Sequence, residues 1–262
     1  MNSFMATAEE AAREGGAVLS RMLGHVTVRE KGPADLVTEA DFASQETIRK
    51  IVLGRYPEHG LIGEEDDPAI GPNLEGEYRW IVDPLDGTTN FVHGVPHFCV
   101  SVALERKDEL LVGAVFNPIS GECFTAEAGQ GAQLNGQPIS ASQVTDLSKG
   151  LAALGLPSVV NSQSPDLRLF NEAMGACQAI RRTGSAALNL CYVACGRFDV
   201  GWSYCTKVWD IAASVLIIRE AGGVIESPDG GDFDVHRGQV FAASNETLMD
   251  QLRALASKAG LR

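Results

Sequence analysis

The sequence predicts a layered fold of the α/β or α+β class, in which helices pack on β-sheets. Two patterns carry this prediction. Segments with apolar residues at helical spacing alternate with short runs of strand-forming residues that end at glycine, asparagine or aspartate. The chain has 262 residues, of which 45% are hydrophobic and 21% are charged. This is an ordinary globular composition, which can bury a core without disulfides.

The N-terminal part of the chain predicts a helical layer. Residues 5–23 and 41–56 both have apolar residues at helical spacing. The side chains available for the inner face of the second helix are Phe42, Ile48, Ile51 and Val52. We expect the two helices to form one layer.

Residues 98–139 predict a first sheet, built as an antiparallel meander. The strand-like segments are CVSVALE, LLVGAVFNP and ECFTAEAG. The pairs Lys107-Asp108 and Ser120-Gly121 lie between these segments and are typical of turns.

The chain after residue 151 predicts a second, mixed sheet. Its short strands are LAALGL, AIRRTG, FDVGWSY, GVIES and QVFAAS, and the helical segments between and after them lie at residues 165–177, 185–196, 210–221 and 245–258. No linker or repeat interrupts the chain. We therefore expect one domain over residues 1–262 with two sub-lobes, roughly 1–145 and 146–262.

The most informative segment is Trp80 to Gly94, WIVDPLDGTTNFVHG. An apolar strand runs into Asp83 and Asp86, whose carboxylates at the end of a strand can converge on hard divalent cations. Gly87 allows a sharp turn that bares amide groups at a helix start, where an anion is favoured. The alternative is an Asp-rich turn without function.

Three other acidic segments are candidate partners of this motif. Leu61 to Glu65 indicates a short strand that ends in a glycine and two acids, which alone would be surface charge. Asp210 opens a strongly helical run, where an aspartate is usually a cap. Residues 31–41 indicate a flexible loop that carries Lys31 and leads into Asp41 before a helix. Each signal is weak alone, and the ordered set is specific.

With these motifs, the chain resembles the inositol monophosphatase family of magnesium-dependent, lithium-sensitive phosphomonoesterases. The resemblance covers essentially the whole chain and is carried by LVTEAD, GEE, WIVDPLDGTTNF, RRTGSAALNL, WDIAAS and EAGG. Relatives that act on fructose bisphosphate or adenosine bisphosphate share the DPLDG core but usually continue it differently. The resemblance implies an αβαβα sandwich, with the site between its two halves.

The resemblance also implies a metal site of two to three Mg²⁺ ions. One ion would be held by Glu64, Asp83 and the carbonyl of Leu85, and a second by Asp83, Asp86 and Asp210. A third, looser ion would bind Glu64. Two ions about 3.5 to 4 Å apart can hold both the attacking and the leaving oxygen of a phosphoryl displacement.

The catalytic groups implied by the resemblance surround these metals. Thr88 would orient a water activated by the metal, with Asp41 and Glu65 as its base and outer acceptor. The groups implied to contact the phosphate and the substrate hydroxyls are Gly87, Thr88, Gly184, Ser185, Ala186 and Asp210. Lys31 either orders the loop over the third ion or is a solvated loop lysine.

One position departs from the family pattern. Seven residues before Asp210, inositol-selective members carry a glutamate that accepts hydrogen bonds from the sugar alcohol, whereas this chain has Ser203. A hydroxyl can still bond a polyol but loses a charge-assisted contact, typically worth about 1.5 to 3 kcal/mol. As a hypothesis, Ser203→Glu raises kcat/KM for inositol 1-phosphate.

Three functional interpretations follow. The first is a Mg²⁺-dependent hydrolase of inositol monophosphate or a similar small polyol phosphate. The second keeps the chemistry but acts on histidinol phosphate, fructose 1,6-bisphosphate or adenosine 3′,5′-bisphosphate. The third is a regulatory protein associated with RNA polymerase, as some bacterial relatives are. A purely non-catalytic role would leave many convergent acids without metal, which is costly.

Charge and composition limit the partners and the location. The chain has 21 Lys and Arg against 34 Asp and Glu, a net charge of −13, which disfavours a nucleic-acid surface. The six cysteines form no CxxC pair and are expected to be reduced. No stretch approaches the 18 apolar residues or so of a membrane span, and no signal peptide is evident. We expect a cytoplasmic protein, and the resemblance implies a homodimer.

Overall fold

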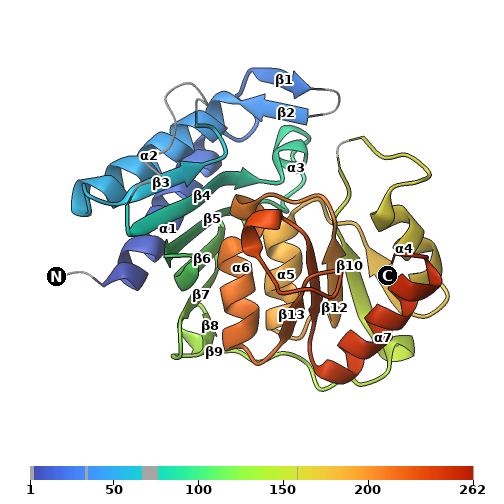
Figure 1. Cartoon of the computed structure of the whole chain (residues 1–262). Coiled ribbons are helices and arrows are strands. Elements are labelled where there is room, and N and C mark those ends of the chain that lie inside the picture. Colours follow the sequence, from blue (N-terminus) through green and yellow to red (C-terminus); the bar gives the residue numbers. More distant parts are fainter. Residues whose placement is uncertain (1–2, 33–34, 67–75, 158, 262) are drawn as a thin grey trace.

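The computed structural model describes residues 3–32, 35–66, 76–157 and 159–261, without the side chains of Lys31 and Asp35. Helices and sheets form five alternating layers (Figure 1). Helices α1 and α2 cover one face of the first sheet, and α5 and α6 lie between the two sheets. Helices α4 and α7 cover the outer face of the second sheet. The predicted αβαβα sandwich is confirmed.

The first helical layer consists of α1 (Phe4–Met22) and α2 (Glu39–Arg55). Helix α2 begins with a capping box, in which the Thr38 N–H donates to Asp41 and the Thr38 hydroxyl accepts from the Ala40 N–H. Ile48 and Val52 are buried as expected, but Phe42 is 49% exposed. Its assignment to the inner face was wrong, because α2 turns the side of Ala40 and Asp41 inward instead.

The first sheet has seven strands in the order of the chain. They are β3 (Gly60–Gly63), β4 (Tyr78–Asp86), β5 (Cys99–Arg106), β6 (Glu109–Asn117), β7 (Glu122–Glu127), β8 (Ala132–Leu134) and β9 (Gln137–Pro138). All neighbours are antiparallel except β3 and β4, which run parallel. The meander and the turn at Lys107-Asp108, where both residues have positive φ, are confirmed.

The second sheet has the order β11-β10-β12-β14-β13 and is mixed, as predicted. Its strands are β10 (Leu151–Leu154), β11 (Ala179–Arg181), β12 (Val200–Ser203), β13 (Val224–Glu226) and β14 (Val240–Ala243). Strands β11, β10 and β12 are parallel, and β14 and β13 complete the sheet antiparallel. Of the second-half helices, α5 (Ala186–Ala194) and α6 (Val208–Glu220) form the middle layer, and α4 (Pro165–Ala173) and α7 (Glu246–Lys258) the outer one.

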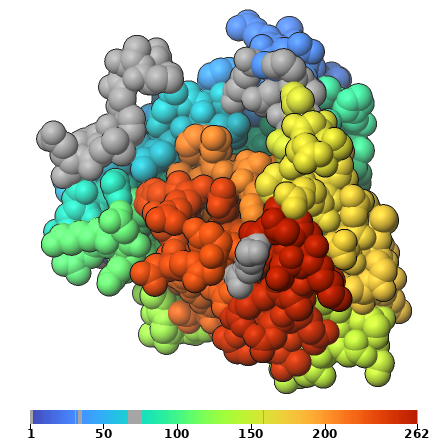
Figure 2. All heavy atoms as spheres, turned by 45° about the vertical axis from the view of Figure 1, so that its right-hand side comes forward, coloured from blue at the N-terminus to red at the C-terminus, as the bar shows by residue number. Residues whose placement is uncertain are grey.

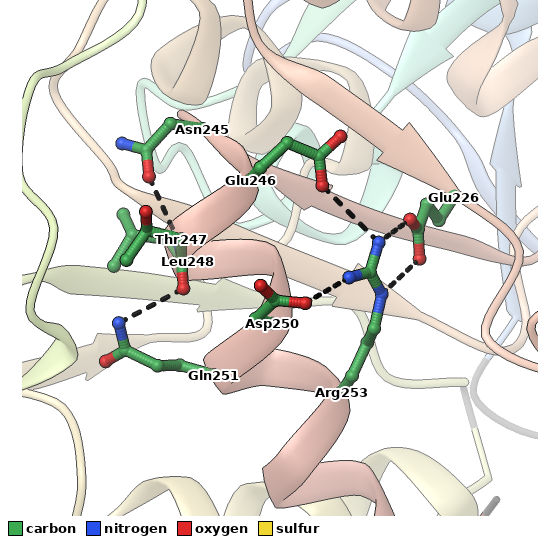
Figure 3. A network of polar contacts seen from close by, with 8 residues as sticks. All are labelled: Glu226, Asn245, Glu246, Thr247, Leu248, Asp250, Gln251 and Arg253. Carbon is green, nitrogen blue, oxygen red and sulfur yellow. Dashed lines mark hydrogen bonds and ion pairs between the residues drawn. The ribbon is translucent and has the colours of Figure 1, made fainter.

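Arg253 anchors the outer helix α7 to the edge strand β13. Its guanidinium pairs with Glu226 of β13 and with Glu246 and Asp250 of its own helix (Figure 3). The space-filling view shows α7 on the surface of the molecule, in red (Figure 2). These ion pairs are partly exposed, and each contributes little on its own.

A hairpin stands where the sequence analysis expected a flexible loop. Strands β1 (Val28–Gly32) and β2 (Asp35–Thr38) pair antiparallel directly before α2. The remaining elements are the short helix α3 (Thr88–Val92) and the 3₁₀ turns η1 (Leu147–Lys149) and η2 (Val235–Arg237). None of the described helices is long and apolar enough to cross a membrane.

Candidate active site

A β-bulge at the end of β4 brings Asp83 and Asp86 to the same side of the strand. Residues three apart in a regular strand point to opposite faces. Here Asp83 faces Ser101 and Asp86 faces Cys99 across the ladder, so β4 holds one extra residue. Pro84, which has no N–H to donate, lies within the bulge. The motif Asp-Pro-Leu-Asp therefore encodes the convergence of its own acids.

Asp86 is held by the start of α5, which belongs to the other half of the chain. Its carboxylate accepts from the Ser185 hydroxyl at 2.5 Å and from the backbone N–H groups of Ala187 at 2.7 Å and Ala186 at 3.2 Å. A carboxylate is stabilised at a helix N-terminus by these unpaired amides. Ser185 also accepts from the Leu188 N–H as the helix cap.

Asp83 and Asp210 complete a cluster of acids with Asp86, in which Asp83 and Asp86 are buried and Asp210 is half-buried. Burial and the negative charges of Glu64, Asp86 and Asp210 raise the pKa of Asp83 well above its usual value. Burial and Asp86 likewise raise the pKa of Asp210. In the part of the chain that the structure describes, none of these three aspartates forms an ion pair with lysine or arginine. The cluster thus carries more negative charge than the protein balances.

Glu64 follows β3, and Asp210 lies in the first turn of α6. The Glu64 N–H donates to the Val82 carbonyl at 3.2 Å, which extends the parallel pairing of β3 and β4 and sets Glu64 beside Asp83. The Lys207 N–H donates to Asp210 at 2.8 Å. Strand ends from the first sheet and a helix start from the second half therefore supply the four acids.

Thr88 and Asp41, two of the residues with a predicted catalytic role, lie side by side. The Thr88 hydroxyl lies 3.1 Å from the Leu85 carbonyl and 3.3 Å from an oxygen of Asp41, so it can donate to either. The second Asp41 oxygen accepts from the N–H and the hydroxyl of Thr38. Asp41 is only 1% exposed, and the Thr88 hydroxyl lies between it and the Leu85 carbonyl.

Two further predicted residues, Glu65 and Lys31, are located by their backbones. The Glu65 N–H donates to the Gln45 side chain at 3.0 Å, next to the Asp66 carboxylate that binds Gln45 and Arg49. The backbone of Lys31 belongs to β1, but its side chain lies outside the described residues. Its role stays a prediction.

Two glycines shape the part of the site predicted to bind phosphate. Gly87 has φ +101° and precedes α3, and a Cβ there would lie 3.1 to 3.2 Å from His97, Gly184 and Phe98. Gly184 has φ +92°, and its Cβ would lie 2.8 Å from the Asn90 side chain. Both positions therefore require glycine. They let the two turns approach each other and line one cleft.

The cleft has a volume of about 470 Å³, within the range of small-molecule sites. Of the site residues predicted from the sequence, those that line the cleft are Asp86, Gly87, Thr88, Gly184, Ser185, Ala186, Ser203 and Asp210. Ser203 is only 3% exposed, and its hydroxyl lies 3.5 Å from the Cys205 thiol. The nearby aromatic residues do not line the cleft: Trp202 is buried in the core, and Tyr204 and Trp209 pack against it.

Sequence reasoning missed several lining residues. Asn90 donates to the carbonyls of His97 and Thr183, and so ties α3 to the turn before α5. Arg182 and the backbone of Gly155 also line the cleft. Asn90 lies inside the central motif and could have been found there. Arg182 lies in the RRTGSAALNL segment that carries the family resemblance, where the sequence analysis assigned it no role.

A separate group of possible metal ligands lies away from this cleft. Glu105, Asp108 and His236 bring one ligand atom each within 4.8 Å of one another. Arg79 already lies there, with its guanidinium 2.7 Å from Glu105 and 2.6 Å from Asp108. This group is therefore compensated by a cation of the protein itself.

The donor set of the cleft fits hard divalent cations. Carboxylates and a backbone carbonyl are the ligands that Mg²⁺ prefers. Asp83, Asp86, Asp210 and Glu64 provide the carboxylates, and Leu85 provides the carbonyl. A bound cation would supply the charge that the buried cluster lacks.

Comparisons with known proteins identify the family of this chain. The sequence model of the inositol monophosphatase family matches residues 1–261. An inositol-1-monophosphatase of Rhizobium meliloti is 41% identical over 95% of this chain and 94% of its own length. The Nus factor SuhB of Pseudomonas aeruginosa is 37% identical over 94% and 93%. The structure of an extragenic suppressor protein suhB from Bartonella henselae matches with a TM-score of 0.89 at 37% identity, over 95% and 96% of the two chains.

Proposed function

Since this chain belongs to the inositol monophosphatase family and is a phosphoric monoester hydrolase, we propose that it is Mg²⁺-dependent and cleaves small polyol phosphates. The observation that carries the proposal is the convergence of Asp83, Asp86 and Asp210, none of which forms an ion pair with a lysine or arginine in the described part of the chain. Such a cluster is costly unless cations bind it.

We infer that Glu64, Asp83, Asp86, Asp210 and the Leu85 carbonyl hold two to three Mg²⁺ ions. When bound, the ions would neutralise the phosphate and make a water molecule more acidic. The hydrogen bonds of Asp86 fix its carboxylate against the start of α5, so its direction is set before any ion binds.

The attacking water would be oriented by Thr88. Because the Thr88 hydroxyl donates to Leu85 or Asp41, its oxygen can accept a hydrogen bond from the water. A proton released by the water would pass to Asp41 through Thr88, since Asp41 is buried and does not line the cleft. Glu65 is the remaining candidate for the outer acceptor. The phosphate would lie against the backbone of Gly87 and Gly184.

The test is phosphate release from inositol 1-phosphate and glycerol 2-phosphate after removal of metals with a chelator. We expect turnover to return when Mg²⁺ is added and to be absent without it. A protein that is equally active with and without the chelator would overturn the metal dependence. Absence of turnover with both substrates in Mg²⁺ would count against a polyol phosphatase.

A second candidate rests on the Nus factor SuhB names of relatives at 37% and 38% identity. A transcription-associated role would use the protein surface and would not need the cleft. Binding to RNA polymerase that survives Asp86→Asn would support it, whereas no binding by either protein would exclude it.

Other properties implied by the family resemblance stay predictions. They are lithium sensitivity, a homodimer and a cytoplasmic location. Inhibition by LiCl, sedimentation analysis and cell fractionation would test them in turn.

A further inference from the structure

Arg182 is a cation placed on the rim of the cleft. It directly follows β11, the edge strand of the second sheet, and its side chain is exposed. Of the described residues that line the cleft, it is the only one with a permanent positive charge. The proposed mechanism does not use it.

The guanidinium of Arg182 has no protein partner among the residues that the structure describes. The neighbouring Arg181 differs, because it donates to the Ile180 carbonyl and does not line the cleft. The chain carries 34 acidic residues, yet none of those described pairs with Arg182. Five N–H donors in a planar array are thus available to a ligand.

The backbone around Arg182 is fixed on the side of the site. The Thr183 carbonyl accepts from Asn90 at 2.8 Å, and its hydroxyl donates to Asn189 at 2.6 Å. Gly184 follows in a conformation that only glycine adopts easily. The turn therefore holds the base of the Arg182 side chain at a constant place relative to Gly184 and α5.

Sheet order places Arg182 away from the position that departs from the family pattern. Strand β10 lies between β11 and β12, so the end of β11 is two strand spacings, about 10 Å, from Ser203 at the end of β12. Arg182 and Ser203 line the same cleft as Asp86 and Asp210, and the phosphate turn at Gly184 begins two residues after Arg182. A phosphate ester held at this turn would have both Ser203 and Arg182 available to its alcohol part.

We propose that Arg182 selects phosphate esters whose alcohol part carries a second anionic group, a phosphate or a carboxylate. Guanidinium binds both groups through paired hydrogen bonds. The inference rests on the proposed phosphatase function. It disfavours substrates with an amine in the alcohol part, such as histidinol phosphate, because the cation would repel them.

The experiment compares two substrate pairs that differ in the second anion. Fructose 1,6-bisphosphate is paired with fructose 1-phosphate, and 2-phosphoglycerate with glycerol 2-phosphate. Initial rates would be measured in Mg²⁺ with the wild-type protein, Arg182→Gln and the matched control Arg181→Gln. The first pair tests a second phosphate and the second pair a carboxylate.

We expect Arg182→Gln to lower kcat/KM for at least one doubly anionic substrate about tenfold or more, as loss of a charge-assisted hydrogen bond does. The singly anionic partner should change less than about twofold, because it does not reach the guanidinium. Arg181→Gln should behave as wild type, and added NaCl should reduce the preference.

Equal effects of Arg182→Gln on both members of each pair, or no effect on either, would overturn the assignment. Turnover of glycerol 2-phosphate by all three proteins would show that the phosphatase function holds independently. A failure of the selectivity proposal is thereby separated from a failure of the proposed function.

Discussion

Buried acids gather in two regions of this protein, and the regions differ in how their charge is balanced. Near the β5–β6 turn, the fully buried Glu105 lies 2.7 Å from Arg79 and 3.0 Å from His236. At the cleft, Asp86 and the neighbouring Asp83 are also buried, but neither forms an ion pair with a lysine or arginine among the described residues. The first region is neutralised by folding, whereas the second keeps its charge for a ligand.

The pKa values follow the same division. The hydrogen bond to Glu105 raises the pKa of His236, so the imidazolium form is favoured beside the buried carboxylate. In the cleft, burial and neighbouring carboxylates raise the pKa of Asp83 and Asp210. Without a cation these acids hold protons more strongly, and a cation would have to displace them.

The largest expected effect is the loss of catalysis in Asp83→Asn. This change removes a charged ligand proposed to be shared by two ions. Mutating a residue that only hydrogen-bonds to a metal ligand already lowers metal affinity or activity by about 10 to 100-fold. For loss of a ligand itself, we expect the rate of phosphate release to fall by more than about 100-fold. Circular dichroism should show a folded protein, with a melting temperature in chelator at or above that of wild type. Turnover within tenfold of wild type would show that Asp83 is not needed to bind a catalytic ion, and the two acidic regions would then not differ in function.

Glu105→Gln should show the opposite pattern. The change removes the buried partner of Arg79 and leaves it with the exposed Asp108 at 2.6 Å. We therefore expect a loss of unfolding free energy of at most the roughly 3 to 5 kcal/mol that breaking a buried ion pair typically costs. Urea denaturation measures this loss, and Mg²⁺-dependent turnover per folded molecule should stay near that of wild type. If instead activity fell while stability held, the two regions would not have separate roles.

Asp166 offers a third case, a buried acid that lies outside the cleft and forms no ion pair among the described residues. It is 1% exposed, it accepts from the Tyr204 N–H at 3.0 Å, and burial raises its pKa to about 6. Between pH 4 and pH 6 the folded chain binds this proton more strongly than the unfolded one, so its contribution to stability falls as pH rises.

Asp166→Asn should remove this pH dependence. The amide oxygen can still accept from Tyr204, and the shift of about two pKa units corresponds to roughly 3 kcal/mol. We therefore expect the variant to gain about that much stability relative to wild type between pH 4 and pH 7, measured by urea denaturation. A constant difference across this range would show that Asp166 stays ionised in the folded protein.

Added Mg²⁺ should raise the free energy of unfolding of the wild-type protein, and this increase should depend on the acids at the cleft and not on Glu105. A ligand that binds only the folded state at 100 times its Kd contributes about 2.7 kcal/mol. Thermal melts with and without MgCl₂ should show this shift in wild type and Glu105→Gln but a smaller one in Asp83→Asn. An equal shift in Asp83→Asn would place the stabilising ion elsewhere.

The sequence predicted the fold and the central motif well, because both depend on local patterns. Strand-like runs that alternate with helical spacing define the two sheets, and DPLDG carries its own bulge. The β1–β2 hairpin was missed, since VREKG and DLVT are short and largely polar.

Contacts between segments that are distant in the sequence could not be predicted from local sequence patterns. Nothing near Asp86 in the sequence indicates that Ser185 and Ala187 hold its carboxylate. Similarly, Arg182 becomes a candidate specificity residue only because the end of β11 lies beside the cleft. Both relations arise from the order of strands in space, which spacing along the chain does not contain.

The hydrogen bonds that Asp86 accepts from the start of α5 offer a spectroscopic view of the site. The amide protons of Ala186 and Ala187 report on a carboxylate that belongs to the other half of the chain. When a cation draws electron density from Asp86, the NMR resonances of these amides should move together. Two backbone signals would then record occupancy of the cleft without any substrate or inhibitor.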